Sequence, residues 1–161
     1  MKKLLSSIAV VATLFATTTG AWAGSTIHIK LLDIGGNIDF SKKLDLGPGG
    51  HGDMKMAPVS LKIDKTIVPA GKVTVSVTNM SKDIQHELIL SPLASKNATL
   101  PMTKDGIKVN EDGANALGEV PELDPGKTGK ATFNLKPGFY MLYCNIEGHV
   151  DAGMWTKIEV K

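Results

Sequence analysis

The chain reads YCNIEGHVDAGMW over residues 143–155, and this stretch holds its only cysteine. Cys144 is followed at equal intervals by His149 and Met154, with four residues between each pair. Thiolate, imidazole and thioether groups are soft or borderline ligands for a transition metal. The stretch therefore predicts a metal site, and we interpret the rest of the sequence as the scaffold that completes it.

A second histidine completes the ligand set from an earlier part of the chain. His86 follows a polar stretch and begins an alternating apolar segment, which places it at the end of a predicted strand. One cysteine, two histidines and a weak axial methionine are the ligands of a blue copper site. Taken singly, each has an ordinary alternative, such as a strand-start histidine, a buried cysteine, a polar loop residue or a core methionine. Their joint order and spacing favour copper.

Alternation of apolar and polar residues predicts about seven short strands and no amphipathic helix. The alternating segments lie at residues 27–31, 59–63, 73–78, 86–90, 131–135 and 156–160, and residues 139–143 are apolar on both faces. Proline precedes glycine in the turns at residues 69–71, 124–127 and 136–138, as in type II turns. This pattern predicts an all-β Greek-key sandwich or barrel of about seven to eight strands.

Two segments lack a strand pattern. Residues 34–58 are rich in glycine, and we expect a long, partly mobile loop there. Residues 94–122 have no clean period; a helical turn fits residues 110–117, and we expect this segment to cross between the sheets. The predicted organisation is a signal peptide at residues 1–23, an N-terminal strand and loop at 24–58 within the same domain, and a core with the copper site at 59–161.

The first residues have the pattern of an export signal. Lys2 and Lys3 precede an apolar run that ends at Thr17, and AWA at residues 21–23 has the small-x-small form of a cleavage site. The run is shorter than the ~20 residues of a membrane span, and no later run is long enough. We therefore expect cleavage after Ala23 and a periplasmic mature protein without a membrane span.

Composition limits the partners of the mature chain. Cleavage would remove two lysines and no acidic residue, so the formal net charge would fall from +2 to 0. Without arginine or a basic stripe, the chain is not expected to bind nucleic acid. A single cysteine cannot form an internal disulfide, so in an oxidising compartment it is explained by metal ligation or by simple burial.

The pattern Cys-x4-His-x4-Met before the last strand, with a histidine on an earlier strand, resembles that of the cupredoxins. This family of blue copper proteins includes plastocyanin, azurin, rusticyanin and auracyanin, and the spacing here is most similar to rusticyanin and auracyanin. The resemblance covers residues 59–161. It implies one type 1 copper per chain in an eight-stranded sandwich, with His86, Cys144 and His149 as strong ligands and Met154 as the axial one.

Two features depart from the family pattern. The residue after the first histidine is often asparagine and here is Glu87, whose backbone N–H could still donate to the cysteine sulfur. Its carboxylate would either lower the reduction potential or face solvent. The loop at residues 34–58 has no plastocyanin counterpart. Its His51, Met54 and Met56 are a candidate second site for Cu(I), against the alternative of methionines packed on the sandwich.

The resemblance implies a periplasmic carrier of single electrons, with the outer edge of His149 as the electron port. Its partner would be a redox protein, such as a cytochrome, an oxidase or a reductase, in a transient contact. The alternative is a copper-binding protein for storage, delivery or resistance, with a copper-acceptor protein as partner. We expect a monomer and no enzymatic activity, because the chain has only four histidines and no His-x-His pair. His28 is expected to be solvated, and Trp155 to pack in the core.

Overall fold

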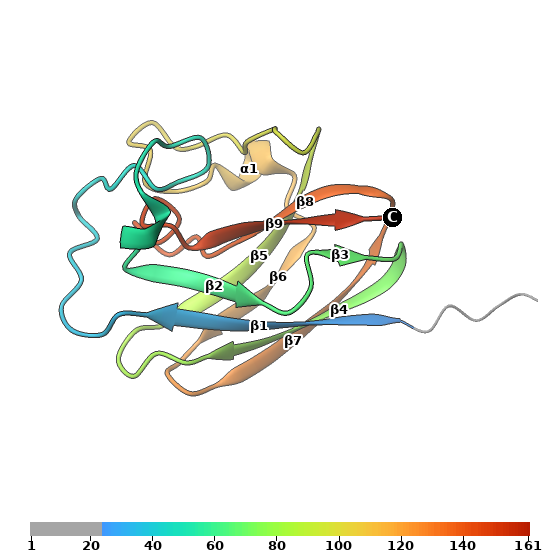
Figure 1. Ribbon diagram of the computed structural model, residues 1–161, viewed down its shortest axis with the longest axis horizontal. Helices are drawn as coiled ribbons and strands as arrows, with labels where there is room; N and C mark the ends of the chain where they lie inside the picture. Colours follow the sequence, from blue (N-terminus) through green and yellow to red (C-terminus); the bar gives the residue numbers. More distant parts are fainter. Residues whose placement is uncertain (1–23) are drawn as a thin grey trace, which may run out of the picture.

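The computed structural model describes residues 24–161, which form two β-sheets packed face to face (Figure 1). One sheet has the strand order β2-β1-β4-β7 and the other the order β3-β9-β8-β5-β6. The strands are β1 Ser25–Asp33, β2 Val59–Ile63, β3 Ile67–Val68, β4 Gly71–Asn79, β5 His86–Leu93, β6 Gly118–Leu123, β7 Thr128–Leu135, β8 Gly138–Tyr143 and β9 Trp155–Val160. The predicted all-β sandwich is confirmed. The predicted signal peptide lies outside the described residues.

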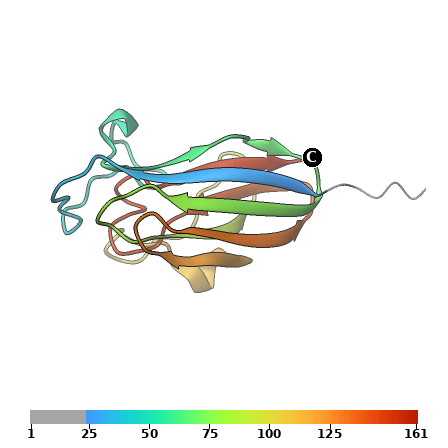
Figure 2. The ribbon, with the colours of Figure 1, turned by 90° about the horizontal axis from the view of Figure 1, so that it is seen from below.

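The four-stranded sheet follows the alternation of its sequence. On β1, Ile27, Ile29 and Leu31 are at most 1% exposed, whereas His28 and Lys30 face solvent. The strand β1 pairs in parallel with β4 and antiparallel with β2, and β7 completes the sheet beside β4. Figure 2 shows the outer face of this sheet, with β1 and β4 side by side. One face of each strand thus forms the core, as a half-buried sheet requires.

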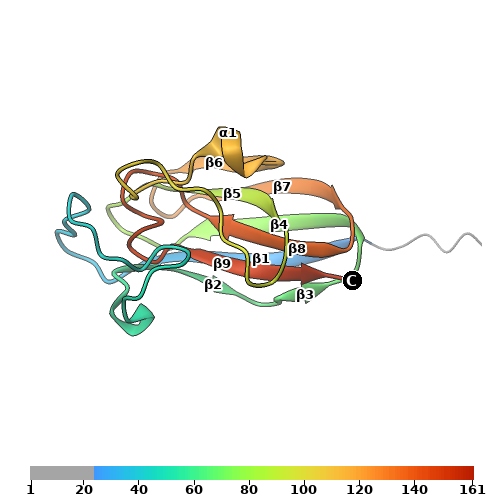
Figure 3. The same ribbon diagram turned by 90° about the horizontal axis from the view of Figure 1, so that it is seen from above.

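The strand β8 is apolar on both faces because it separates two cores. Leu142 belongs to the main core between the sheets, and Met141 and Tyr143 belong to a second cluster on the outer face. That cluster includes Val109 and Ala114, from the segment between β5 and β6. Figure 3 shows this segment passing over the outer face of the five-stranded sheet. The segment contains the short helix α1 Glu111–Ala114, which lies within the predicted helical turn.

The prediction that residues 94–122 cross between the sheets is wrong. They connect β5 to β6, which are neighbours in the same sheet, and β6 itself begins at Gly118. The chain changes sheet in the turn after β6, where Lys127 N–H donates to the Asp124 carbonyl at 3.0 Å and β7 follows. The two strands that bring the total to nine, β3 and β6, are short or mostly exposed, so their sequences carry no clear alternation.

Candidate metal centre

The predicted ligands meet at the end of the sandwich opposite the C-terminus, where the β8–β9 connection lies (Figure 1). His86 is the first residue of β5, Cys144 follows β8, and Met154 precedes β9. The turn before His86 is fixed by the buried Asn79, whose Nδ2 donates to the carbonyls of Ile84 and Leu123, both at 2.8 Å. The packed strands therefore hold the ligand-bearing residues in place.

Three of the four side chains face one another closely. The ligand atoms of His86, Cys144 and His149 all lie within 4.8 Å of one another. The two Nδ1 atoms are 3.2 Å apart, and the Cys144 Sγ is 3.3 Å from the His149 Nδ1. These residues are at most 2% exposed. A thiol and two imidazoles thus point at a common centre that water does not reach.

Met154 is joined to this centre through its backbone and through burial. Its N–H donates to the His149 carbonyl and its carbonyl accepts from the Cys144 N–H, both at 3.0 Å. Its side chain is fully buried in the same core cluster as Cys144. The loop turns at Gly148 and Gly153, with φ values of 80° and 99°, which glycine adopts most readily. All four predicted ligands therefore belong to one buried region.

The electrostatics of the centre favour neutral groups when no metal is bound. Burial lowers the pKa of His86 and of His149 to about 4; the nearby Asp33 opposes this shift at His86, and the charge of His86 adds to it at His149. Burial raises the pKa of the Cys144 thiol to about 12. Neutral imidazole is the form that binds a metal, so the histidines are ready near pH 7, whereas the thiol must lose its proton on binding.

Glu87 keeps the sulfur contact that its backbone was expected to make. Its N–H points at the Cys144 Sγ at 3.5 Å, and its Oε1 accepts from the Asn145 N–H at 3.0 Å. Burial raises the pKa of the Glu87 carboxyl, with Glu119 and Glu111 among the lesser causes. The carboxylate thus joins the start of β5 to the residue after Cys144.

Sequence reasoning missed Asn145, which anchors the base of the ligand loop. Its Oδ1 accepts from the Val109 N–H at 2.7 Å, and its Nδ2 donates to the Val109 carbonyl at 3.1 Å and to Glu111 Oε1 at 2.6 Å. It is 2% exposed. Its only signal in the sequence is its position next to Cys144, since its partners lie 34 and 36 residues away.

The outer edge of His149, which was expected to be the electron port, is not open to solvent in the structure. His149 is only 2% exposed, and the ring of Phe40 lies against its ring with a centroid separation of 4.3 Å. Phe40 comes from the loop at residues 34–58. The sequence gives no indication of this contact, because it joins residues more than a hundred positions apart.

The structure places the remaining candidates outside the buried centre. His51, Met54 and Met56 lie on exposed parts of the loop, and Met54 and Met56 are 45% and 76% exposed. His28 is exposed on the outer face of the four-stranded sheet, as expected. Trp155 packs against the second core cluster, also as expected, and its Nε1 donates to the Leu46 carbonyl at 2.7 Å.

The donor set fits copper. The centre offers one thiol, two imidazoles and one thioether, all of them buried. This is the ligand set of copper sites that cycle between Cu(II) and Cu(I). Within the described residues, His86 Nε2 is buried without a hydrogen-bond partner, so its Nδ1 faces the centre and its other nitrogen remains free. The sandwich and this site together define a cupredoxin.

Comparisons with known proteins agree with this class. A family model of the sulfocyanin (SoxE) domain matches residues 56–161, and the chain belongs to this family. Two solved structures are similar in fold: reduced auracyanin from the photosynthetic bacterium Roseiflexus castenholzii and auracyanin B. Both are 22% identical with a TM-score of 0.50; the match covers 85% of this chain and 97% and 88% of theirs.

A variant of rusticyanin is also similar in structure, at 22% identity and a TM-score of 0.49, over 87% of this chain and 79% of that one. No curated protein matches the chain in sequence. In the described part of the chain, no helix combines the length and apolarity needed to cross a membrane.

Proposed function

We propose that the protein is an exported carrier of single electrons with one type 1 copper per chain, held by His86, Cys144, His149 and Met154. The observation that carries this proposal is the buried convergence of two imidazole Nδ1 atoms and one thiol within 4.8 Å. Bound copper would supply reversible one-electron chemistry. The protein's own contribution is to exclude water, fix the ligands on packed strands and direct the Glu87 N–H at the sulfur.

Absorption spectroscopy tests the site. Cu(II) added to the purified protein should give an intense thiolate-to-copper band in the visible region, and Cys144→Ser should abolish it. His28→Ala is the matched control, since this exposed histidine lies on the outer face of the other sheet and its loss should leave the band unchanged. A colourless complex, or a band that persists in Cys144→Ser, would overturn the assignment.

A copper-handling role is the second candidate, supported by the position of Met54. A methyl group at Gly153 would lie 3.6 Å from the Met54 sulfur, so this exposed thioether sits beside the residue that precedes Met154. With Met56 and His51 it could hold Cu(I) in transit to an acceptor protein. Copper transfer that is lost in a Met54→Leu, Met56→Leu double variant would favour handling, whereas a reversible redox couple with rapid exchange would favour the carrier.

The proposed partner of the carrier is a redox protein, such as a cytochrome, an oxidase or a reductase, in a transient contact with a monomer. Transient electron-transfer complexes use small interfaces, so a large apolar surface is not needed. We do not propose an enzymatic activity, because copper enzymes need additional histidines, usually in His-x-His pairs, and this sequence has four histidines and no such pair.

A further inference from the structure

The N-terminal loop at residues 34–58 is attached directly to the ligand loop. Asp151, two residues after His149, accepts from the Leu44 N–H through its side chain at 2.6 Å and from the Leu46 N–H through its carbonyl at 3.0 Å. The Leu46 carbonyl in turn accepts from Trp155 Nε1 at 2.7 Å. Hydrogen bonds to a largely buried carboxylate are among the stronger ones, so the two loops are held together on both sides of Met154.

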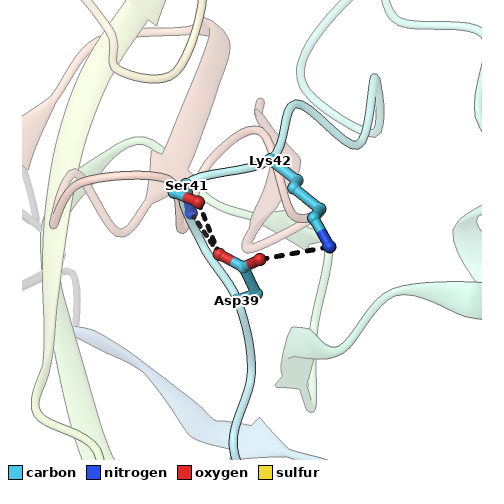
Figure 4. A network of polar contacts seen from close by, with 3 residues as sticks. All are labelled: Asp39, Ser41 and Lys42. Carbon is cyan, nitrogen blue, oxygen red and sulfur yellow. Dashed lines mark hydrogen bonds and ion pairs between the residues drawn. The ribbon is translucent and has the colours of Figure 1, made fainter.

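Phe40 is held in place by a short polar turn. The Asp39 Oδ1 accepts from the Ser41 N–H at 3.1 Å and from the Ser41 hydroxyl at 2.6 Å, and Lys42 Nζ lies 3.3 Å from Asp39 Oδ2 (Figure 4). Such a turn fixes the backbone on both sides of the aromatic residue. The ring is therefore presented by a locally ordered segment.

The ligand loop is shaped to receive this segment. Gly148 has a φ of 80°, and a methyl group there would lie 2.6 Å from the Phe40 carbonyl oxygen and 2.8 Å from its Cβ. No side chain other than hydrogen fits at that distance. The residue before the second histidine is thus a glycine both because of its backbone conformation and because Phe40 approaches it closely.

Among the described residues, two aromatic rings lie against His149. The His86 ring, at a centroid separation of 5.0 Å, is completely buried. Phe40, whose ring lies at 4.3 Å, is a partly buried residue, so it reaches the surface. We propose that Phe40, and not His149, forms the outer surface of the copper site, so that a redox partner exchanges electrons with the site across the Phe40 ring.

This inference rests on the proposed electron-carrier function for its redox consequence, but its structural part does not. In each exchange the reduced site loses one electron and a one-electron acceptor gains it, without a proton or a new bond. The acceptor's closest approach is then set by the Phe40 ring. The matched family model begins at residue 56, so the segment that carries this ring lies outside the matched region.

Chemical modification of the copper-free protein tests directly whether Phe40 shields His149 from solvent. Diethyl pyrocarbonate acylates accessible neutral imidazoles, and peptide mass spectrometry assigns the modified histidine. In the unchanged protein His28 and His51 should react, and His86 and His149 should not. In Phe40→Ala, His149 should become reactive while His86 remains protected.

Two further variants make this test decisive. Phe40→Leu fills most of the space and should keep His149 protected. Phe133→Ala, on β7 where it pairs with Val73 away from the ligands, should not change the pattern. If His149 remains unreactive in a folded Phe40→Ala protein, or if Phe133→Ala exposes it equally, the inference is wrong. If Phe40→Ala does not fold, reactivity of His149 in Phe40→Leu equal to that of His51 would overturn it.

Electron exchange tests the redox consequence. With hexacyanoferrate(III) as acceptor, Phe40→Ala should oxidise about tenfold faster than the unchanged copper protein, equivalent to about 1.4 kcal/mol in activation free energy. Phe40→Leu and Phe133→Ala should stay close to the unchanged rate. Equal rates in all four proteins would refute the role of Phe40 while leaving the carrier function intact. Absence of the thiolate-to-copper band from the unchanged protein with Cu(II) would instead refute the proposed function.

Discussion

The stability of the copper-free protein should fall steeply as the pH drops from about 6.5 to 4. Burial lowers the pKa of His86 and His149 from 6.5 to about 4. Between these two pH values the unfolded chain therefore binds protons that the folded chain does not bind. Stability from these groups is therefore fully present above pH 6.5 and is lost as the pH falls through the folded pKa. At pH 5 the loss is about 2 kcal/mol for each histidine.

The slope of the unfolding free energy against pH shows how many histidines titrate. Two histidines should contribute a slope of about 2.4 kcal/mol per pH unit between pH 4.5 and 6, and one histidine about half of that. Urea unfolding of the copper-free protein, repeated across this range, measures the slope. His149→Gln removes one titrating group, and subtracting its slope from that of the unchanged protein cancels the carboxylates that titrate nearby. Equal slopes in the two proteins would refute the reasoning.

Three other perturbations follow from particular contacts. Gly148→Ala should destabilise the protein by at least about 1 kcal/mol more than Gly126→Ala, because both residues have positive φ and only the first also meets neighbouring backbone; thermal unfolding of both variants measures the difference. Glu87→Gln should raise the reduction potential by removing a negative charge beside the site, and voltammetry against Glu159→Gln, a variant of β9, would show whether position matters. Asp151→Asn should cost about 1–3 kcal/mol in unfolding free energy by weakening its bond to the N-terminal loop, and an unchanged urea midpoint would contradict that contact.

The strands that could be predicted are those that bury one face against the other sheet. On β4 and β1 the alternation is regular because every second residue enters the core. The strand β6 could not be predicted this way, since only Val120 and Leu123 are buried and the register shifts opposite β5 between His86 and Leu88. A bulge breaks the period of two on which sequence reading depends.

Three of the four predicted ligands could be grouped from the sequence because Cys144, His149 and Met154 are spaced along one loop, which is local information. The contact of Phe40 with His149 could not be predicted, because it joins segments that are far apart in the chain. Phe40 lies in a glycine-rich stretch where no period indicates burial, and its partner His149 is 109 positions later. Glycine-rich composition predicted a partly mobile loop, whereas Asp151 and Trp155 attach this one to the ligand loop.

The net charge of the whole chain does not show that basic and acidic residues lie on different sheets. The strands of the four-stranded sheet carry Lys30, Lys62, Lys72 and Lys130 against one acidic residue, Asp33. The strands of the other sheet carry three glutamates on β5 and β6, one on β9, and a single lysine, Lys157.

The proposed ligand His86 begins β5 of the acidic sheet and the proposed ligand Cys144 follows its strand β8. Burial raises the pKa of Glu87 beside them, and the charges of Glu119, Glu111 and Glu122 add to this shift. If the site holds copper as proposed, a negative field of this kind would favour its oxidised, more positive form and would attract cationic partners to that side. Acidic side chains therefore gather on the sheet that carries the proposed ligands, and this follows from the arrangement of the strands and not from the composition.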